Sequence, residues 1–189
     1  SALMEEANLT DADCKGATLT KAQMQRCVIT GADLTNANMS VTDLSGAQGL
    51  QGTKLCGASL QKAVLTEAVL TGADLTKAVM SAARLGRAQL AGASLCESDM
   101  RGADLACADL AGTDLSRAQL VTAKLEGATG LGTATLVDAN LSGASMSGLD
   151  LSGKDLSQLD LSGADLRKTN LSGANLSGSN LSGAKLEEA

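Results

Sequence analysis

Residues 103–115 read ADLACADLAGTDL, in which a large apolar residue returns at every fifth position. The same repeat covers nearly the whole chain of 189 residues, with apolar centres at every fifth position from Met4 to Leu44, from Leu50 to Leu125 and from Leu131 to Leu186. Five residues of α-helix advance about 500°, so the leucines would not form one buried stripe. In a continuous strand an odd spacing would place successive leucines on opposite faces. The repeat therefore excludes a long amphipathic helix and a simple long strand.

Each five-residue unit has the same internal order. The residue two before the centre is nearly always small, as Ala73 is before Leu75, and the residue between them is polar, as is Asp74. In a short extended run, the small residue and the centre share one face and the polar residue points away. The last two residues, typically Ser-Gly or Thr-Gly, suit a corner. The pattern predicts a narrow solenoid with leucine and alanine inside, in which each coil contacts only its neighbours.

The units resemble those of the pentapeptide-repeat family, as in ANLSG at residues 139–143 and 174–178 and ADLAG at residues 108–112. The resemblance covers essentially the whole chain. It implies an all-β fold, a right-handed parallel quadrilateral β-helix with four pentapeptides per coil, as one domain over residues 1–189. At ~4.8 Å between paired strands, about nine coils would give a rod about 45 Å long.

The composition fits a narrow coil and excludes several functions. The chain has no Phe, Tyr, Trp, Pro or His, and all six methionines occupy centres, where they are predicted to fill the core. A net charge of −6 argues against nucleic-acid binding. The sequence contains no run of 18 apolar residues, so no membrane insertion is predicted.

The reactive side chains do not form a catalytic pattern. Without histidine there is no Ser-His-Asp or Cys-His arrangement and no imidazole ligand. Most aspartates directly precede a centre, where they can accept bonds from turn N–H groups. Cys14 and Cys27 are predicted to be buried, and Cys56, Cys96 and Cys107 to face outward or lie at corners. Free thiols favour a reducing compartment such as the cytoplasm. We therefore expect no enzyme activity, cofactor, metal ion or small-molecule substrate.

Two insertions of one residue interrupt the repeat, one near residue 49 and one near residue 130. Glycine beside each insertion can supply the dihedral angles of a bulge. Leu50 and Leu131 are 81 positions apart, sixteen units and one residue, so both bulges should lie on one side of the rod. They are either contacts for a partner, through Gly49, Leu50, Gln51, Gly130 and Leu131, or tolerated bulges inherited by duplication.

Three valines replace the usual polar residue before a centre. Val64, Val69 and Val79 fall within one coil, where they would form a small apolar contact patch. The alternative is that valine simply suits extended backbone.

A further irregularity lies in the coil at residues 146–161. Leu149, Lys154 and Leu159 occupy three successive positions where a small residue is expected, so this coil should be wide or distorted. A buried unpaired ammonium is costly, so Lys154 should reach outward or pair with Asp150 or Asp155.

The ends of the sequence carry no capping segment, although an open coil end exposes strand edges and apolar side chains. Either the chain is an excerpt of a longer protein, or a partner covers its ends. We therefore expect a non-enzymatic scaffold, a rigid rod that binds other proteins in a larger assembly, including at its uncapped ends.

The alternative comes from the family resemblance. Some pentapeptide-repeat proteins resemble duplex DNA, bind type II topoisomerases such as gyrase and protect them from inhibitors. A duplex carries about one charge per 1.7 Å, which a net charge of −6 does not approach.

Overall fold

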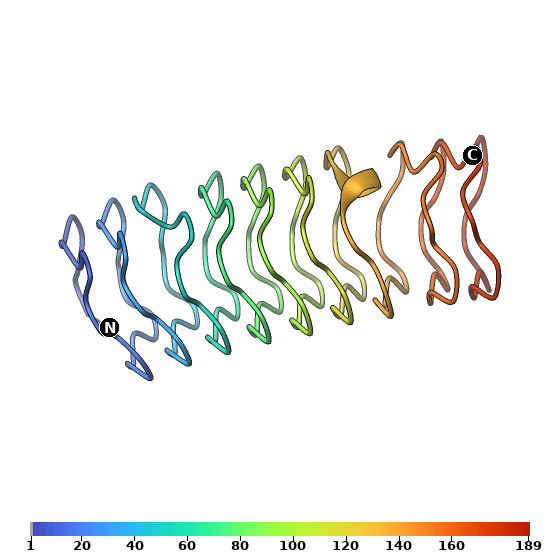
Figure 1. Cartoon of the computed structure of the whole chain (residues 1–189). Coiled ribbons are helices and arrows are strands. Elements are labelled where there is room, and N and C mark those ends of the chain that lie inside the picture. The colour runs from blue at the N-terminus through green and yellow to red at the C-terminus, as the bar shows by residue number, and fades with distance from the viewer. Residues whose placement is uncertain (1) are drawn as a thin grey trace.

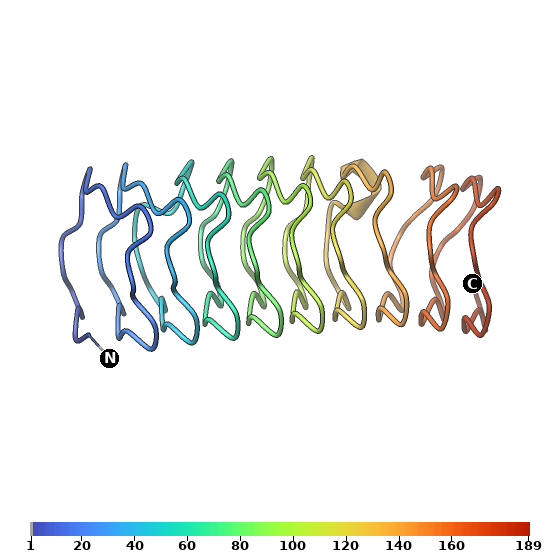
Figure 2. The ribbon, with the colours of Figure 1, turned by 90° about the horizontal axis from the view of Figure 1, so that it is seen from below.

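The chain forms a rod of stacked coils in a computed structural model that describes residues 2–189; Ser1, the first residue of the predicted domain, lies outside them. Figure 1 shows the coils following one another along the rod, with the two termini at opposite ends, and Figure 2 shows the same stack after a quarter turn. This confirms the predicted right-handed quadrilateral β-helix.

The coils are held together by isolated parallel bridges, and no longer strand occurs within residues 2–189. Bridged residues are 20 positions apart in regular stretches, as in the pairs Asp74–Ser94 and Ser94–Asp114. Most centres donate their N–H to the next coil, as Leu95 does to the carbonyl of Asp114 at 2.8 Å. The one helix in the described part of the chain is the 3₁₀ helix η1, Leu131–Thr133.

The coil has four faces, which we name A to D in chain order. Outward-facing residues that pair along them include Val28, Gln48, Asp109 and Thr129 on face A; Lys54, Asp74, Asp114 and Thr135 on face B; Asn38, Ser59, Val79 and Asp99 on face C; and Asp43, Val64, Arg84 and Asp104 on face D.

The corners are four-residue turns closed by a backbone hydrogen bond. Ala83 donates its N–H to the carbonyl of Met80 at 2.9 Å, for example, and the intervening Ala82 has φ of 56°. A positive φ at the third turn residue is the conformation that type II turns require. The turns adopt it with glycine, as at Gly72 with φ of 65°, and without it, as at Arg87 with φ of 59°. The repeat therefore imposes a positive φ at the third residue of the corner even where that residue is not glycine.

The core is a continuous column of centres and small residues. Five of the six methionines are buried among the leucines, which confirms their predicted role, and Met4 is partly buried. Cys27 is buried as predicted, but Cys14 is only half-buried. Cys14 lies in the first described coil, where no preceding coil covers it, so the prediction that it is buried was wrong.

Candidate functional site

Both one-residue insertions lie on face A, as predicted. Along this face Val28 pairs with Gln48 and Asp109 pairs with Thr129, and Gly49 or Gly130 follows directly. Their φ angles are 77° and 74°. Beyond each insertion the bridge spacing on face B grows from 20 to 21 positions, for example from Asp114 to Thr135.

Glycine is required at both bulges because the backbone of the preceding coil lies very close. A Cβ added to Gly49 would lie 2.6 Å from the Cα of Thr30, and one added to Gly130 would lie 2.5 Å from the Cα of Ala111. A threonine hydroxyl donates to each glycine carbonyl at 2.9 Å, from Thr53 at the first bulge and Thr133 at the second. Each bulge is therefore fixed by a close backbone approach and a threonine hydrogen bond, although no bridge joins Gln48 to Val69 or Thr129 to Asp150 within the described residues.

Not all predicted contact residues at the bulges can reach a partner. Leu50 and Leu131 are buried in the core, whereas Gln51 is exposed and Gly49 and Gly130 are half-buried. A hollow of about 490 Å³ lies beside the first bulge, between residues 45–47 and 66–69. Gln51 and this hollow are the accessible features of the first bulge.

The three predicted valines do not form one patch. Val64 lies on face D, Val69 follows on face A, and Val79 lies on face C, because residues five positions apart occupy successive faces. Val64 and Val69 are half-buried, and Val79 is 38% exposed. The most exposed valine is Val137 at 61%, which the sequence analysis missed. It could have been found as a valine directly after a centre, where serine or threonine is usual.

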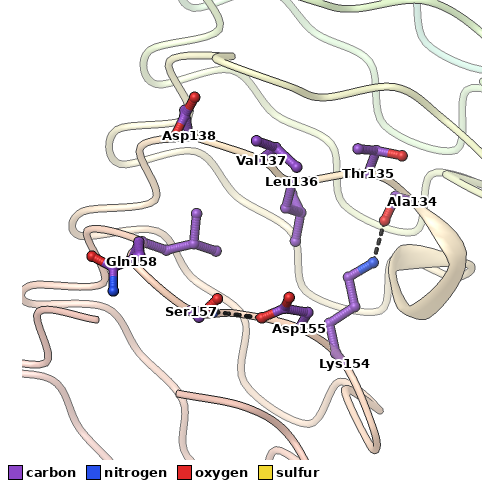
Figure 3. A pocket seen from close by; sticks show the side chains of 10 residues that line it. Ala134, Thr135, Leu136, Val137, Asp138, Lys154, Asp155, Ser157 and Gln158 are labelled. Atoms are coloured by element: carbon purple, nitrogen blue, oxygen red, sulfur yellow. Dashed lines mark hydrogen bonds between the residues drawn. The ribbon is translucent and has the colours of Figure 1, made fainter. Parts of the chain in front are cut away.

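Lys154 makes contacts that the sequence did not predict. Its Nζ donates to the backbone carbonyls of Ala134 and, at 3.3 Å, Gly132, rather than pairing with Asp150 or Asp155 (Figure 3). Burial lowers the pKa of Lys154, and the nearby Asp155 carboxylate opposes this shift. The prediction of a carboxylate partner was wrong because η1 and the residue after it present carbonyls to the ammonium.

These contacts lie at a break in the ladder of face B. Leu115 and Arg117 donate their N–H groups to the carbonyls of Thr135 and Val137, both at 2.8 Å. One coil later the ladder is interrupted, since no bridge joins Thr135 to Asp155 within the described chain, and it resumes with the bridge from Asp155 to Asn175. The separation leaves a hollow of about 420 Å³ between residues 134–138 and residues 154–159, which we call the open seam.

A column of alternating charges leads along one corner of the rod to the open seam. Glu97 lies 3.7 Å from both Lys77 and Arg117, and Arg117 lies 3.8 Å from Asp138. Each exposed pair contributes only about 0–1 kcal/mol, so the column matters more for recognition than for stability. The next residue in it is the uncharged Gln158.

The aspartates before the centres act in turns, as predicted. The hydrogen bond of the Thr35 side chain is the main cause that lowers the pKa of Asp33 to about 2, and the N–H of Thr35, which donates to Asp33 at 3.1 Å, also lowers it. The hydrogen bonds of Arg167 likewise lower the pKa of Asp165 to about 2.

Other chemical features are few. Over residues 2–189 no group of three or more His, Cys, Asp or Glu side chains is arranged to hold a metal ion. The same stretch contains no helix long and apolar enough to cross a membrane. All five cysteines are free thiols, and burial raises the pKa of Cys27.

The sequence matches the family profile described as pentapeptide repeats, in eight copies, over residues 6–47, 50–81, 83–120, 134–173 and 155–189. The matched ranges omit residues 48–49 and 121–133, which contain the bulge glycines. No curated protein sequence matches the chain significantly.

Three solved structures illustrate the similarity. HetL, a pentapeptide repeat protein involved in heterocyst differentiation regulation from the cyanobacterium Nostoc sp. strain PCC 7120, is 35% identical, with 97% of this chain and 86% of HetL covered and a TM-score of 0.52. A trypsin-treated variant of QnrB1, a plasmid-mediated fluoroquinolone resistance protein, is 21% identical, with 89% and 84% covered and a TM-score of 0.41. A pentapeptide repeat protein from the Arabidopsis thaliana thylakoid lumen is 33% identical, with 51% and 66% covered and a TM-score of 0.26.

Proposed function

Because the chain belongs to the pentapeptide repeat family, we propose that it is a non-enzymatic scaffold, a rigid rod whose surfaces bind other proteins within a larger assembly. The observation that carries this proposal is the continuous core, which runs from Met24 to Leu166 and is closed by hydrogen bonds between successive coils. A stack of coils joined in this way resists bending and holds each face at a fixed orientation. A partner therefore meets a preformed surface and has little ordering entropy to offset.

Two further observations support a binding role. The carboxylates that could serve as acids or bases are engaged in turns, as in the bond from Thr35 to Asp33. HetL, similar over most of its length, is described by its part in regulation. A regulatory task suits a protein that acts by binding.

The surfaces proposed for partners are the sides and the two ends of the described stack. On the sides they include Gln51 at the first bulge and Val79 on face C, both exposed. At the ends the centres Leu9 and Leu176 are only partly buried, so apolar surface is accessible there. A protein bound at an end would cover it and pair with the outermost coil.

The gyrase alternative has less support from the surface. A mimic of duplex DNA needs a long acidic stripe, because the duplex carries about one negative charge per 1.7 Å. The column from Lys77 to Asp138 instead alternates in sign. Gyrase binding is therefore kept as an alternative outcome, which the gyrase assay described below detects.

The proposal is tested by site-specific photocrosslinking in the native host, with a crosslinking residue at one exposed position on each face and at each end. Partners identified by mass spectrometry are then purified and mixed with the chain. The proposal predicts a direct complex that crosslinks from one face or end and not from the others. A chain that stays monomeric by native mass measurement and crosslinks from no position would overturn it.

Two assays distinguish the other classes. Protection of gyrase supercoiling from an inhibitor by the purified chain would support the DNA-mimic alternative. Turnover of any compound in a broad substrate panel would contradict the non-enzymatic assignment.

A further inference from the structure

We propose that the open seam binds a short extended segment of a partner protein, which bridges the separated coils through its main chain and places a basic side chain beside Asp138. This inference rests on the proposed function, because it assigns one particular surface to a protein partner of the rod.

The backbone presents unpaired hydrogen-bonding groups from both sides of the seam. The N–H groups of Leu136 and Asp138 have no hydrogen-bond acceptor within residues 2–189. By the pattern of the regular coils, they would donate to the carbonyls of Asp155 and Ser157, which receive no donor from the described chain either. One edge of the seam therefore offers donors and the opposite edge offers acceptors.

The side chains at the opening cause the separation of the two coils. In regular coils the residue before a centre donates its N–H to the preceding coil, and Asp155 would donate to Ala134. The ammonium of Lys154 takes that carbonyl instead. Leu149 and Leu159, 5% and 3% exposed, occupy positions that hold alanine in most coils, and they bring larger side chains into the interior there. The seam is thus held open by the chain's own residues.

The unpaired groups of the seam favour an extended peptide as its occupant. An extended peptide carries one donor and one acceptor per residue, so it can pair with the donors on one edge and the acceptors on the other. This is the main-chain recognition used when a peptide adds to a sheet edge. The hollow of about 420 Å³ is partly open to solvent, so an extended segment can enter it from outside. Leu136 and Val137 line it, and the exposed Val137 supplies an apolar contact (Figure 3).

The charges beside the seam set the preferred side chain of the bound segment. The column of alternating charges ends at Asp138, which lines the seam opposite the uncharged Gln158 and whose carboxylate lies 3.8 Å from Arg117 of the preceding coil. A segment inserted between these two residues would add one position to the column. After the pair formed by Arg117 and Asp138, that position calls for a cation. We therefore assign lysine or arginine to the segment.

The experiment selects a phage-displayed library of random linear heptapeptides on the full folded chain. Enriched peptides are synthesised, and their dissociation constants are measured by fluorescence anisotropy. The inference predicts peptides with a lysine or arginine among β-branched residues. In amide NMR spectra, bound peptide is expected to shift the signals of Leu136, Asp138 and Asp155 most strongly.

Two variants and one control locate the site. The triple variant Leu149→Ala, Lys154→Ala and Leu159→Ala restores the regular alanine pattern, closes the seam and is expected to weaken peptide binding at least tenfold. Because this variant could change the fold, Asp138→Asn provides a milder test and is expected to weaken binding about threefold to fivefold, the range of one exposed charge pair. Glu5→Gln removes an exposed charge paired with Arg26 near the N-terminal end of the rod, away from the column and the hollow, and should leave binding unchanged.

The inference is overturned if no library peptide shifts the seam amides, if the triple variant and Asp138→Asn both bind peptide as the unaltered chain does, or if peptides shift the amides of residues 45–47 and 66–69 instead. Self-association through the seam would also overturn it. A rod that crosslinks to protein partners elsewhere but takes no peptide at the seam would keep the proposed function and lose only this inference.

Discussion

Replacing Gly130 with alanine tests whether the second bulge depends on glycine. The φ of Gly130 is 74°, a conformation that costs an L-residue about 1–2 kcal/mol. An added Cβ would lie 2.5 Å from the Cα of Ala111 and 2.8 Å from its Cβ. Carbon atoms in favourable contact are about 3.5–4.0 Å apart, so the overlap is about 1 Å and the backbone must move.

The expected loss follows from adding these two costs. Overpacking in a well-packed region costs about 1–3 kcal/mol, so Gly130→Ala should lower the free energy of unfolding by about 2–5 kcal/mol. Gly112→Ala is the matched control, since Gly112 has φ of 62° and an added Cβ would have nothing within 4 Å. Ala82 already adopts φ of 56° at an equivalent corner. The control should lose only about 1–2 kcal/mol, the conformational cost.

The assay is urea unfolding at equilibrium, followed by circular dichroism, for the unaltered chain and both variants. A lower midpoint with an unchanged slope reports stability rather than a change in the surface exposed. If the two variants lose the same free energy, the close approach of Ala111 to the bulge is refuted as the reason for glycine.

Four further predictions concern the core and the carboxylates. Ser98→Ala removes a buried hydroxyl that has no partner in the described chain, and it should raise the free energy of unfolding by about 1 kcal/mol in urea. Thr113→Val loses a bond of 3.1 Å to a backbone carbonyl and should lower it by about 1 kcal/mol. Leu105→Ala empties a fully buried position and should cost about 3–5 kcal/mol in the same assay; a loss below about 1 kcal/mol would contradict the close-packed core. Asp33 and Asp165 have pKa values of about 2, below the ordinary 3.8, so their stabilising contribution is present above about pH 4 and is lost as the pH falls towards 2. The urea midpoint should fall over that window, and by less in Asp33→Asn; an equal fall in the variant would contradict the role of Asp33.

The regular part of the fold could be predicted from the sequence because each unit repeats the same physical task. Leu105 marks the interior, Asp74 marks the outward turn position, and four units make one coil in the family that the chain resembles. The common face of Gly49 and Gly130 followed from counting units. These predictions needed only the period of the repeat and the local behaviour of each residue type.

The irregular part depended on contacts between coils that the sequence does not state. Lys154 could be recognised as an inward-placed cation, but its partners are carbonyls about twenty residues earlier, presented by η1 and by Ala134. The valine patch failed for a simpler reason, since Val64 and Val69, five residues apart, lie on successive faces. The open seam required knowing that η1, which follows the bulge on face A, lies where Lys154 can reach a carbonyl on face B.

Amide hydrogen exchange along face B tests the central claim, a rod whose face B is hydrogen-bonded from coil to coil and is open between Thr135 and Asp155. The N–H groups of Leu115 and Arg117 are bonded at 2.8 Å and should be protected, whereas those of Leu136 and Asp138, one coil later, have no acceptor in the described chain. Exchange at Leu136 and Asp138 is expected to be at least about tenfold faster than at Leu115 and Arg117, because an amide without a hydrogen bond needs no opening to exchange. Equal protection at all four positions would mean that the ladder is closed there, and would contradict the open seam.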